Sequence, residues 1–145
     1  MVTDTLVQIG QTIATTRSID PRTMTFEEAE SIFQFASDLY EAGHYAKATP
    51  LFQTVATFCP LEYKNWFGLG ACLQMEARYE EALTAWSVAA SMQEEVDPYV
   101  HAAECFLSLK QKDQALNALN IALGKLKEPS AKIEGMLSLI KGEVK

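Results

Sequence analysis

Cysteines, long apolar runs and clusters of basic residues are all scarce in this chain, and each shortage narrows what the protein can be. The three cysteines are an odd number and no signal-peptide pattern opens the sequence, so we expect a reduced, cytoplasmic protein. No stretch reaches about 18 consecutive apolar residues, the length of a membrane-spanning helix, so no direct membrane insertion is expected. Lysine and arginine form no cluster and the formal net charge is −7, which argues against a nucleic-acid partner.

Motifs of known chemistry are missing as well. The sequence has no glycine-rich phosphate loop, no nucleophile elbow, no HExxH motif and no CxxC pair. His101 and Cys105 are four residues apart and would share a helical face, which could make a thiolate pair or half a metal site, but no second ligand pair exists. We interpret both as packing residues and expect no enzyme activity, no cofactor and no metal; a small enzyme is a third hypothesis that depends on these two residues alone.

The composition is that of one soluble domain. Of the 145 residues, 48% are hydrophobic and 21% charged, which is ordinary for a globular protein. The five prolines and seven glycines are scattered, so no linker divides the chain. We expect a single all-helical domain over residues 1–145.

A repeat of 33 to 34 residues organises most of this domain. Aligning Ile32, Trp66 and Tyr99 brings other positions into register: Phe35, Leu69 and Ala102; Ala36, Gly70 and Ala103; Leu39, Leu73 and Phe106; Ala48, Ala82 and Ala115; Phe52, Trp86 and Leu119; Val55, Ala89 and Ala122. The pattern resembles the tetratricopeptide repeat, and WFGLG at 66–70 matches the first half of that repeat closely. The sequence therefore predicts an all-α fold of three tandem helix-turn-helix repeats over residues 26–125, wound into a right-handed superhelix.

The spacing of small and large residues predicts how the helices of one repeat pack. Two antiparallel helices approach closely only where their crossing point has small side chains. In the central repeat we expect Gly70 against Ala82, with Trp66 and Trp86 filling the space beside that contact.

Capping and turn residues predict the helix boundaries. Residues 25–28, TFEE, form a capping box, and Asp97-Pro98 gives an N-cap followed by proline at the first helical position. Turns are expected at 42–44, 77–78 and 110–111. The six repeat helices are then expected at 26–42, 45–58, 62–76, 79–93, 98–109 and 112–125.

Two flanking segments complete the prediction. Residues 129–142 start with proline and place Ile133, Met136, Leu137 and Ile140 on one face, as expected of a helix that caps the last repeat. In the N-terminal segment, residues 1–24, an apolar stripe recurs at spacings of three and four. It either packs on the first repeat or serves self-association, and it consists of Val2, Leu6, Ile9 and Ile13.

The concave wall of such a superhelix is made by the first helix of each repeat, and counting along the register gives its inward residues. Any apolar one alone could belong to the core, but as a set they recur on the face that the crossing-point pattern leaves unused. We expect a groove for an extended peptide, in which each buried anchor contributes about 1.5 to 3 kcal/mol before ordering costs. The inward residues are Phe33, Ser37 and Tyr40; Phe67, Ala71 and Gln74; and Val100, Glu104 and Leu107.

A narrower resemblance rests on LGAC at 69–72, YEEAL at 79–83 and HAAEC at 101–105. With these motifs the chain resembles the class II chaperones of bacterial type III secretion, over three repeats and an N-terminal helical segment. The resemblance implies a bacterial cytoplasmic chaperone that keeps hydrophobic, pore-forming translocators soluble and unassembled before export. It also implies an extended P-x-L-x-x-P segment in the groove and self-association, as in a homodimer, through the N-terminal region.

By position, the resemblance carries the groove over to Phe33, Tyr40, Tyr45, Phe67, Ala71, Gln74, Glu104 and Leu107. One departure is the short DPYV stretch at 97–100, where relatives have a longer proline-rich entry before HAAEC. The alternative is a generic tetratricopeptide-repeat adaptor in a secretion or regulatory assembly. It shares the fold but would bind folded partners through its convex face.

Overall fold

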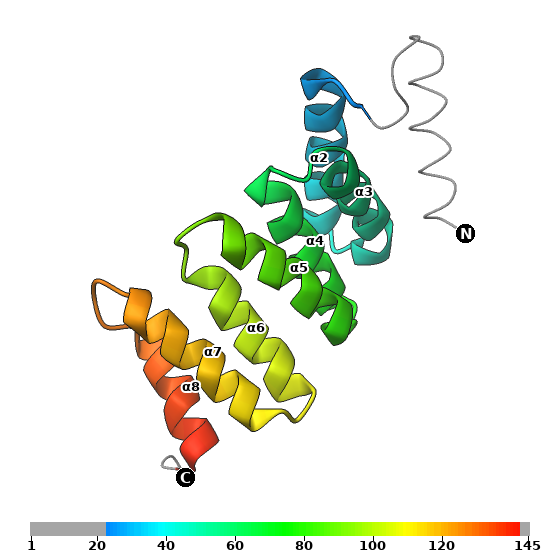
Figure 1. Ribbon diagram of the computed structural model, residues 1–145. Helices are drawn as coiled ribbons and strands as arrows, with labels where there is room; N and C mark the ends of the chain where they lie inside the picture. Colours follow the sequence, from blue (N-terminus) through cyan, green and yellow to red (C-terminus); the bar gives the residue numbers. More distant parts are fainter. Residues whose placement is uncertain (1–22, 143–145) are drawn as a thin grey trace. The chain divides into compact units, whose positions relative to one another are not determined.

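The computed structural model describes residues 23–142, which form seven helices and, within that range, no strand (Figure 1). Each helix boundary lies within two residues of the expected one. None of these helices has the length and apolar character needed to cross a bilayer. Labelled as in Figure 1, they are α2 (Phe26–Glu41), α3 (Tyr45–Phe58), α4 (Tyr63–Met75), α5 (Tyr79–Met92), α6 (Asp97–Ser108), α7 (Lys112–Lys125) and α8 (Ala131–Lys141).

The helices fall into two compact units, and the chain passes from one to the other at Ala77–Arg78. In the first unit α3 contacts both α2 and α4, and α2 also contacts α4. In the second, α6 packs between α5 and α7, and α8 packs on α7. The expected contact of Gly70 with Ala82 joins helices of different units and stays a prediction of the sequence.

Left-handed backbone at matching positions marks the turn inside each repeat. Gly43, Ala77 and Lys110 have φ values of 82°, 58° and 61°, and they follow one another at the repeat spacing of 34 and 33 residues. After α2 the amides of Gly43 and His44 donate to the carbonyls of Tyr40 and Leu39, which is the Schellman pattern that ends a helix. The turns predicted at these places are therefore confirmed.

The two predicted N-caps differ in outcome. The Thr25 hydroxyl accepts a hydrogen bond from the Glu28 amide at 3.1 Å, as the capping box requires. The predicted N-cap Asp97 is wrong by one residue, because α6 begins at Asp97 and Val96 is the cap. The Val96 carbonyl already accepts from the amides of Tyr99 and Val100, so Asp97 contributes negative charge to the first turn instead of a cap.

Burial follows the repeat register. Ala48, Ala82 and Ala115 are fully buried, as are Val55, Ala89 and Ala122 at the third aligned position of the second helices. Between them, Phe52, Trp86 and Leu119 are 3%, 1% and 0% exposed. The small-and-large alternation read from the sequence is therefore the alternation of the core.

The last helix covers the end of the second unit. Ser130 caps α8 by accepting from the Ile133 amide, and Gly142 ends it in the left-handed conformation. Ile133 and Leu137 enter the apolar core formed by α6 and α7, and Met136 and Ile140 pack at its edge. These are the four residues expected on the capping face.

Candidate functional site

The first unit holds seven of the ten predicted groove residues on three neighbouring helices. All seven are half-buried, so each is fixed by its neighbours and still has surface to offer a ligand. Phe33, Ser37 and Tyr40 lie on α2, Tyr45 lies on α3, and Phe67, Ala71 and Gln74 lie on α4.

Ring contacts hold the aromatic members of this group in place. The rings of Tyr40 and Tyr45 meet edge to face with centroids 5.2 Å apart, which joins α2 to α3. Phe67 is 5.8 Å from Tyr63, one turn earlier on α4. Aromatic pairs in such geometries add about 0.5 to 1.5 kcal/mol beyond the area that they bury. We call Phe33, Tyr40, Tyr45, Tyr63 and Phe67 the aromatic set.

Phe33 rests on the core of the first unit. Its ring lies edge-on to the buried Phe52, with centroids 5.6 Å apart. Phe52 in turn occupies the space left by Gly68, where any side chain would meet its ring. The position of Phe33 therefore depends on Gly68 of α4, because Gly68 leaves room for the Phe52 ring that supports Phe33.

Ser37 and Tyr40 add two uncharged hydroxyl groups to this site. The Ser37 hydroxyl donates to the Phe33 carbonyl at 2.9 Å. Burial, followed by Tyr45, Cys72 and Glu41, raises the pKa of Tyr40. The Tyr40 hydroxyl therefore keeps its proton and can donate a hydrogen bond to a peptide carbonyl.

The sequence prediction missed two residues of this site, one a member of the aromatic set and one beside it. Tyr63 precedes Phe67 by four residues and so shares its helical face, a spacing that could have indicated it. Lys64 lies with its ammonium over the Phe33 ring, 4.4 Å from the centroid, and pairs with Glu30. Glu30 and Lys64 are 34 residues apart, the repeat spacing, so their register also could have indicated the pair.

The second unit places its three candidates differently. Val100 is 6% exposed and belongs to the apolar core with Ala103 and Leu119, so little of its surface can reach a ligand. Glu104 and Leu107 are half-buried. The Glu104 carboxylate lies 2.8 Å from Nδ1 of His101 and 3.9 Å from Nζ of Lys132, which links α6 to α8.

The surroundings of His101 and Cys105 are those of packing residues. The His101 ring stacks on Trp86 with centroids 4.6 Å apart. Burial, with a smaller effect of Glu104, raises the pKa of Cys105 to about 11, which makes the thiol a poor nucleophile at neutral pH. Within residues 23–142 no three metal-ligating side chains of His, Cys, Asp or Glu form a group.

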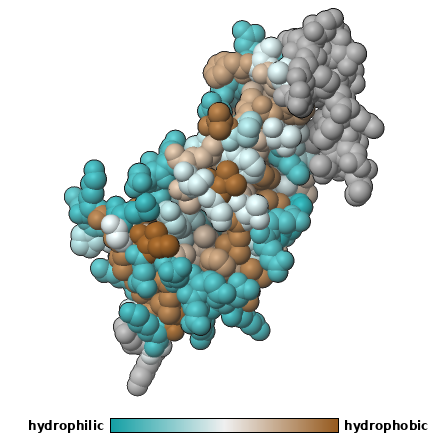
Figure 2. Space-filling model, in the orientation of Figure 1, coloured by the Kyte–Doolittle hydropathy of each residue, from teal (hydrophilic) through white to brown (hydrophobic). Residues whose placement is uncertain are grey.

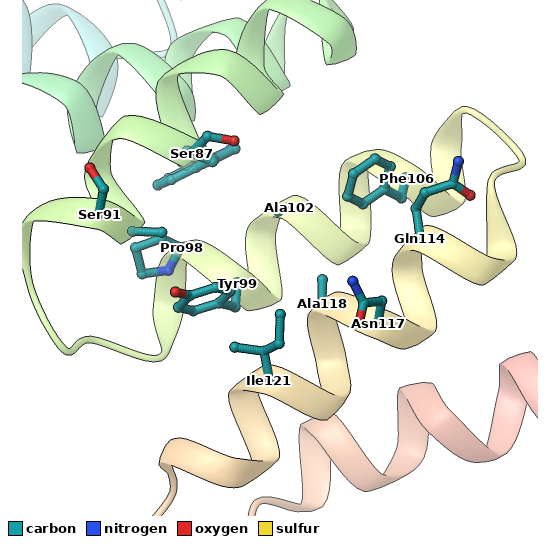
Figure 3. A pocket seen from close by; sticks show the side chains of 12 residues that line it. Ser87, Ser91, Pro98, Tyr99, Ala102, Phe106, Gln114, Asn117, Ala118 and Ile121 are labelled. Carbon is teal, nitrogen blue, oxygen red and sulfur yellow. The ribbon is translucent and has the colours of Figure 1, made fainter.

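A hollow of about 340 Å³ lies in the second unit, and none of the predicted groove residues lines it. Figure 3 shows Ser87 and Ser91 of α5 on one side, Pro98, Tyr99 and Phe106 of α6 along the floor, and Gln114, Asn117 and Ile121 of α7 opposite. Figure 2 shows hydrophobic surface over this unit beside hydrophilic side chains. Its remaining lining residues are Trp86, Ala90, Ala102 and Ala118.

The N-terminal apolar stripe of Val2, Leu6, Ile9 and Ile13 lies outside the described residues. Its two alternatives, packing on the first repeat or self-association, stay predictions of the sequence.

Helix pairs with a buried small-residue register and matching left-handed turns define a tetratricopeptide-repeat protein. A family model for the tetratricopeptide repeat matches residues 63–95, the stretch that contains both tryptophans. The expected fold class is thereby confirmed.

Similarity to known proteins extends over nearly the whole chain. It is 31% identical over 140 residues to the low calcium response locus protein H of Yersinia pestis, covering 91% of this chain and 80% of that protein. The type III secretion chaperone SycD of Yersinia enterocolitica, solved with a peptide of the translocator YopD, is 27% identical with a TM-score of 0.78, over 82% of this chain and 96% of SycD. PcrH of Pseudomonas aeruginosa, solved with the chaperone-binding region of PopD, is 28% identical with a TM-score of 0.77, over 83% of this chain and 96% of PcrH. The chain belongs to the low calcium response locus protein H family, the class II translocator chaperones of type III secretion.

Proposed function

We propose that this protein binds an extended apolar segment of a hydrophobic translocator through the aromatic set of its first unit. By covering that segment in the bacterial cytoplasm, it keeps the translocator soluble and unassembled until export. The SycD and PcrH structures that contain translocator peptides support a peptide as the ligand.

The observation that carries the proposal is a group of half-buried aromatic side chains at positions that the core does not use. Core residues of the repeats, such as Ala36, Val55 and Leu69, are at most 7% exposed, whereas every member of the aromatic set is half-buried. A surface of this kind is pre-organised, because ring contacts have already removed the freedom of its side chains. Apolar area there is available to a partner without unfolding anything.

The energetics suit a chaperone that must release its cargo. Each apolar anchor seated on the aromatic set contributes about 1.5 to 3 kcal/mol, and ordering an extended segment costs part of this. Micromolar binding corresponds to about 8 kcal/mol, so a few anchors suffice. The net charge of −7 keeps a loaded complex soluble.

Co-expression with a translocator of the same secretion system tests the proposal. Wild type should move the translocator from the insoluble to the soluble fraction. The double variant Tyr40→Glu with Phe67→Glu should lose this rescue while its circular dichroism keeps the helical signal, because burying two carboxylates against an apolar segment is costly.

The matched control places the same charges on exposed apolar residues of the first unit that lie outside the aromatic set. Phe35 and Leu61 are 57% and 88% exposed, and Phe35→Glu with Leu61→Glu should keep the rescue. Rescue by the Tyr40 and Phe67 variant would contradict the proposal. If that variant still bound while changes at Tyr99 and Ile121 abolished binding, the hollow of the second unit and an adaptor function would be favoured.

A further inference from the structure

Lys64 occupies a site built from an aromatic face and a carboxylate. Its ammonium lies 4.4 Å from the centroid of the Phe33 ring and forms an ion pair with the Glu30 carboxylate across α2 and α4. An aromatic face and a carboxylate are the two groups that proteins use together to bind an ammonium or guanidinium ion. Phe33 cannot turn away freely, because the buried Phe52 ring lies against it.

The hold on Lys64 is weak enough for exchange. The side chains of Lys64 and Glu30 are 39% and 40% exposed, and ion pairs of that kind contribute little net stability. Lys64 also lies in the first turn of α4, where the helix dipole disfavours a positive charge. Its own helix therefore does nothing to keep the ammonium in this site.

The surrounding charge favours a cation from outside. Residues 23–77 contain seven acidic and two basic side chains, and α2 alone contains five acidic and no basic ones. A basic side chain that approaches Phe33 is attracted by this excess, whereas an acidic one is repelled.

We propose that Phe33 and Glu30 form a cation subsite that the chain fills with its own Lys64 when free. A lysine or arginine of the bound translocator segment fills it in the complex. The subsite selects segments that place a basic residue beside their apolar anchors. This inference rests on the proposed function and adds to it a determinant of specificity.

Pairs of synthetic peptides test the subsite. Each peptide has the Pro-x-Leu-x-x-Pro spacing, with lysine at one variable or flanking position, and its twin has norleucine there, which is uncharged and similar in length. Isothermal titration at low salt measures the dissociation constants. At one position the lysine peptide should bind wild type about threefold to tenfold more tightly than its twin, as a cation–π contact with a carboxylate beside it allows.

Three variants separate the subsite from general charge effects. Glu30→Gln should remove the preference for the lysine peptide. Lys64→Met should tighten binding of the lysine peptide about threefold to tenfold and change the affinity of the norleucine twin less than about twofold. Only the lysine peptide has a cation that can enter the site that Lys64 has left. Lys47→Met makes the same change of charge on an exposed part of α3 and should leave the ratio between the twins at its wild-type value.

These measurements distinguish failure of the cation subsite from failure of the proposed function. If Glu30→Gln keeps the preference, or Lys64→Met improves both twins equally, the subsite is refuted while binding of the norleucine twins leaves the proposed function standing. If wild type binds no peptide of either kind, both are refuted.

Discussion

Gly68 is the position where one methyl group should have the largest effect on the site. A Cβ at residue 68 would lie 2.6 Å from Cδ1 and 2.8 Å from Cζ of Phe52, whereas carbon atoms in favourable contact are about 3.5 to 4.0 Å apart. Phe52 is 3% exposed and its ring is edge-on to Phe33. The Phe52 ring cannot make room for the methyl group without displacing the Phe33 ring.

The expected cost follows from two opposing effects. Overpacking of a well-packed core costs about 1 to 3 kcal/mol, and replacing glycine by alanine inside a helix returns about 0.5 to 1 kcal/mol. The difference between the two is about 0 to 2.5 kcal/mol. Because the added Cβ would overlap a buried ring, we expect Gly68→Ala to fall in the upper part of this range and to lower the free energy of unfolding by about 1 to 2 kcal/mol. It should also weaken peptide binding, because Phe33 moves with Phe52.

Urea unfolding followed by circular dichroism measures this cost, and Gly135→Ala is the control. Gly135 lies inside α8, and a Cβ added there would have no neighbouring atom within 4 Å, so the same substitution should stabilise by about 0.5 to 1 kcal/mol. Phe52→Leu should relieve the overlap, so that Gly68→Ala costs less in that background. If Gly68→Ala stabilises the protein as Gly135→Ala does, the layered packing of Gly68, Phe52 and Phe33 is refuted.

Two further predictions concern buried polar groups. Asn65 is 2% exposed and its side chain donates to the carbonyls of Val55 and Cys59 at 3.2 and 3.1 Å. Asn65→Ala should therefore lower the free energy of unfolding, measured in urea, by about 1 to 3 kcal/mol. A loss below about 0.5 kcal/mol, the range of ordinary surface changes, would show that these bonds do not hold the end of α3. Burial raises the pKa of Cys72 from 9.0 to about 12, against a smaller lowering by its hydrogen bond with Thr49. Because the folded state keeps this proton, the stability is complete below pH 9 and falls as the pH rises toward 12, with a slope near 1.4 kcal/mol per pH unit for the thiol. Cys72→Ala should flatten that alkaline slope, and an unchanged slope would contradict the assignment.

The sequence predicted what local chemistry and periodicity determine. Helix boundaries came within two residues, because the turns around Gly43, Ala77 and Lys110 recur at the repeat spacing and Thr25 caps the start of α2. The buried alanines and large residues of the second helices were also predicted, since close helix packing dictates where small side chains must stand. The spacing of turn residues and of small and large side chains was therefore enough to predict most of the fold.

The parts that the sequence did not predict depend on three-dimensional contacts. Val100 was expected to face the groove, but its neighbours on α7 and α8 draw it into a core, and periodicity does not tell a core-facing valine from a groove-facing one. Lys64 was missed although its separation of 34 residues from Glu30 matches the repeat spacing, because register alone does not show that the ammonium lies over the Phe33 ring. The shift of the cap from Asp97 to Val96 is a matter of one residue of backbone conformation, the least predictable feature of a helix.

If the proposed function is right, the aromatic set of the first unit receives the translocator segment. An isotope-filtered NOE spectrum of the labelled chaperone with the unlabelled segment tests it most directly. We expect contacts from the segment to the ring protons of Tyr40, Tyr45 and Phe67. Contacts confined to Trp86, Tyr99 and Ile121 around the hollow of the second unit, with none to the aromatic set, would contradict it.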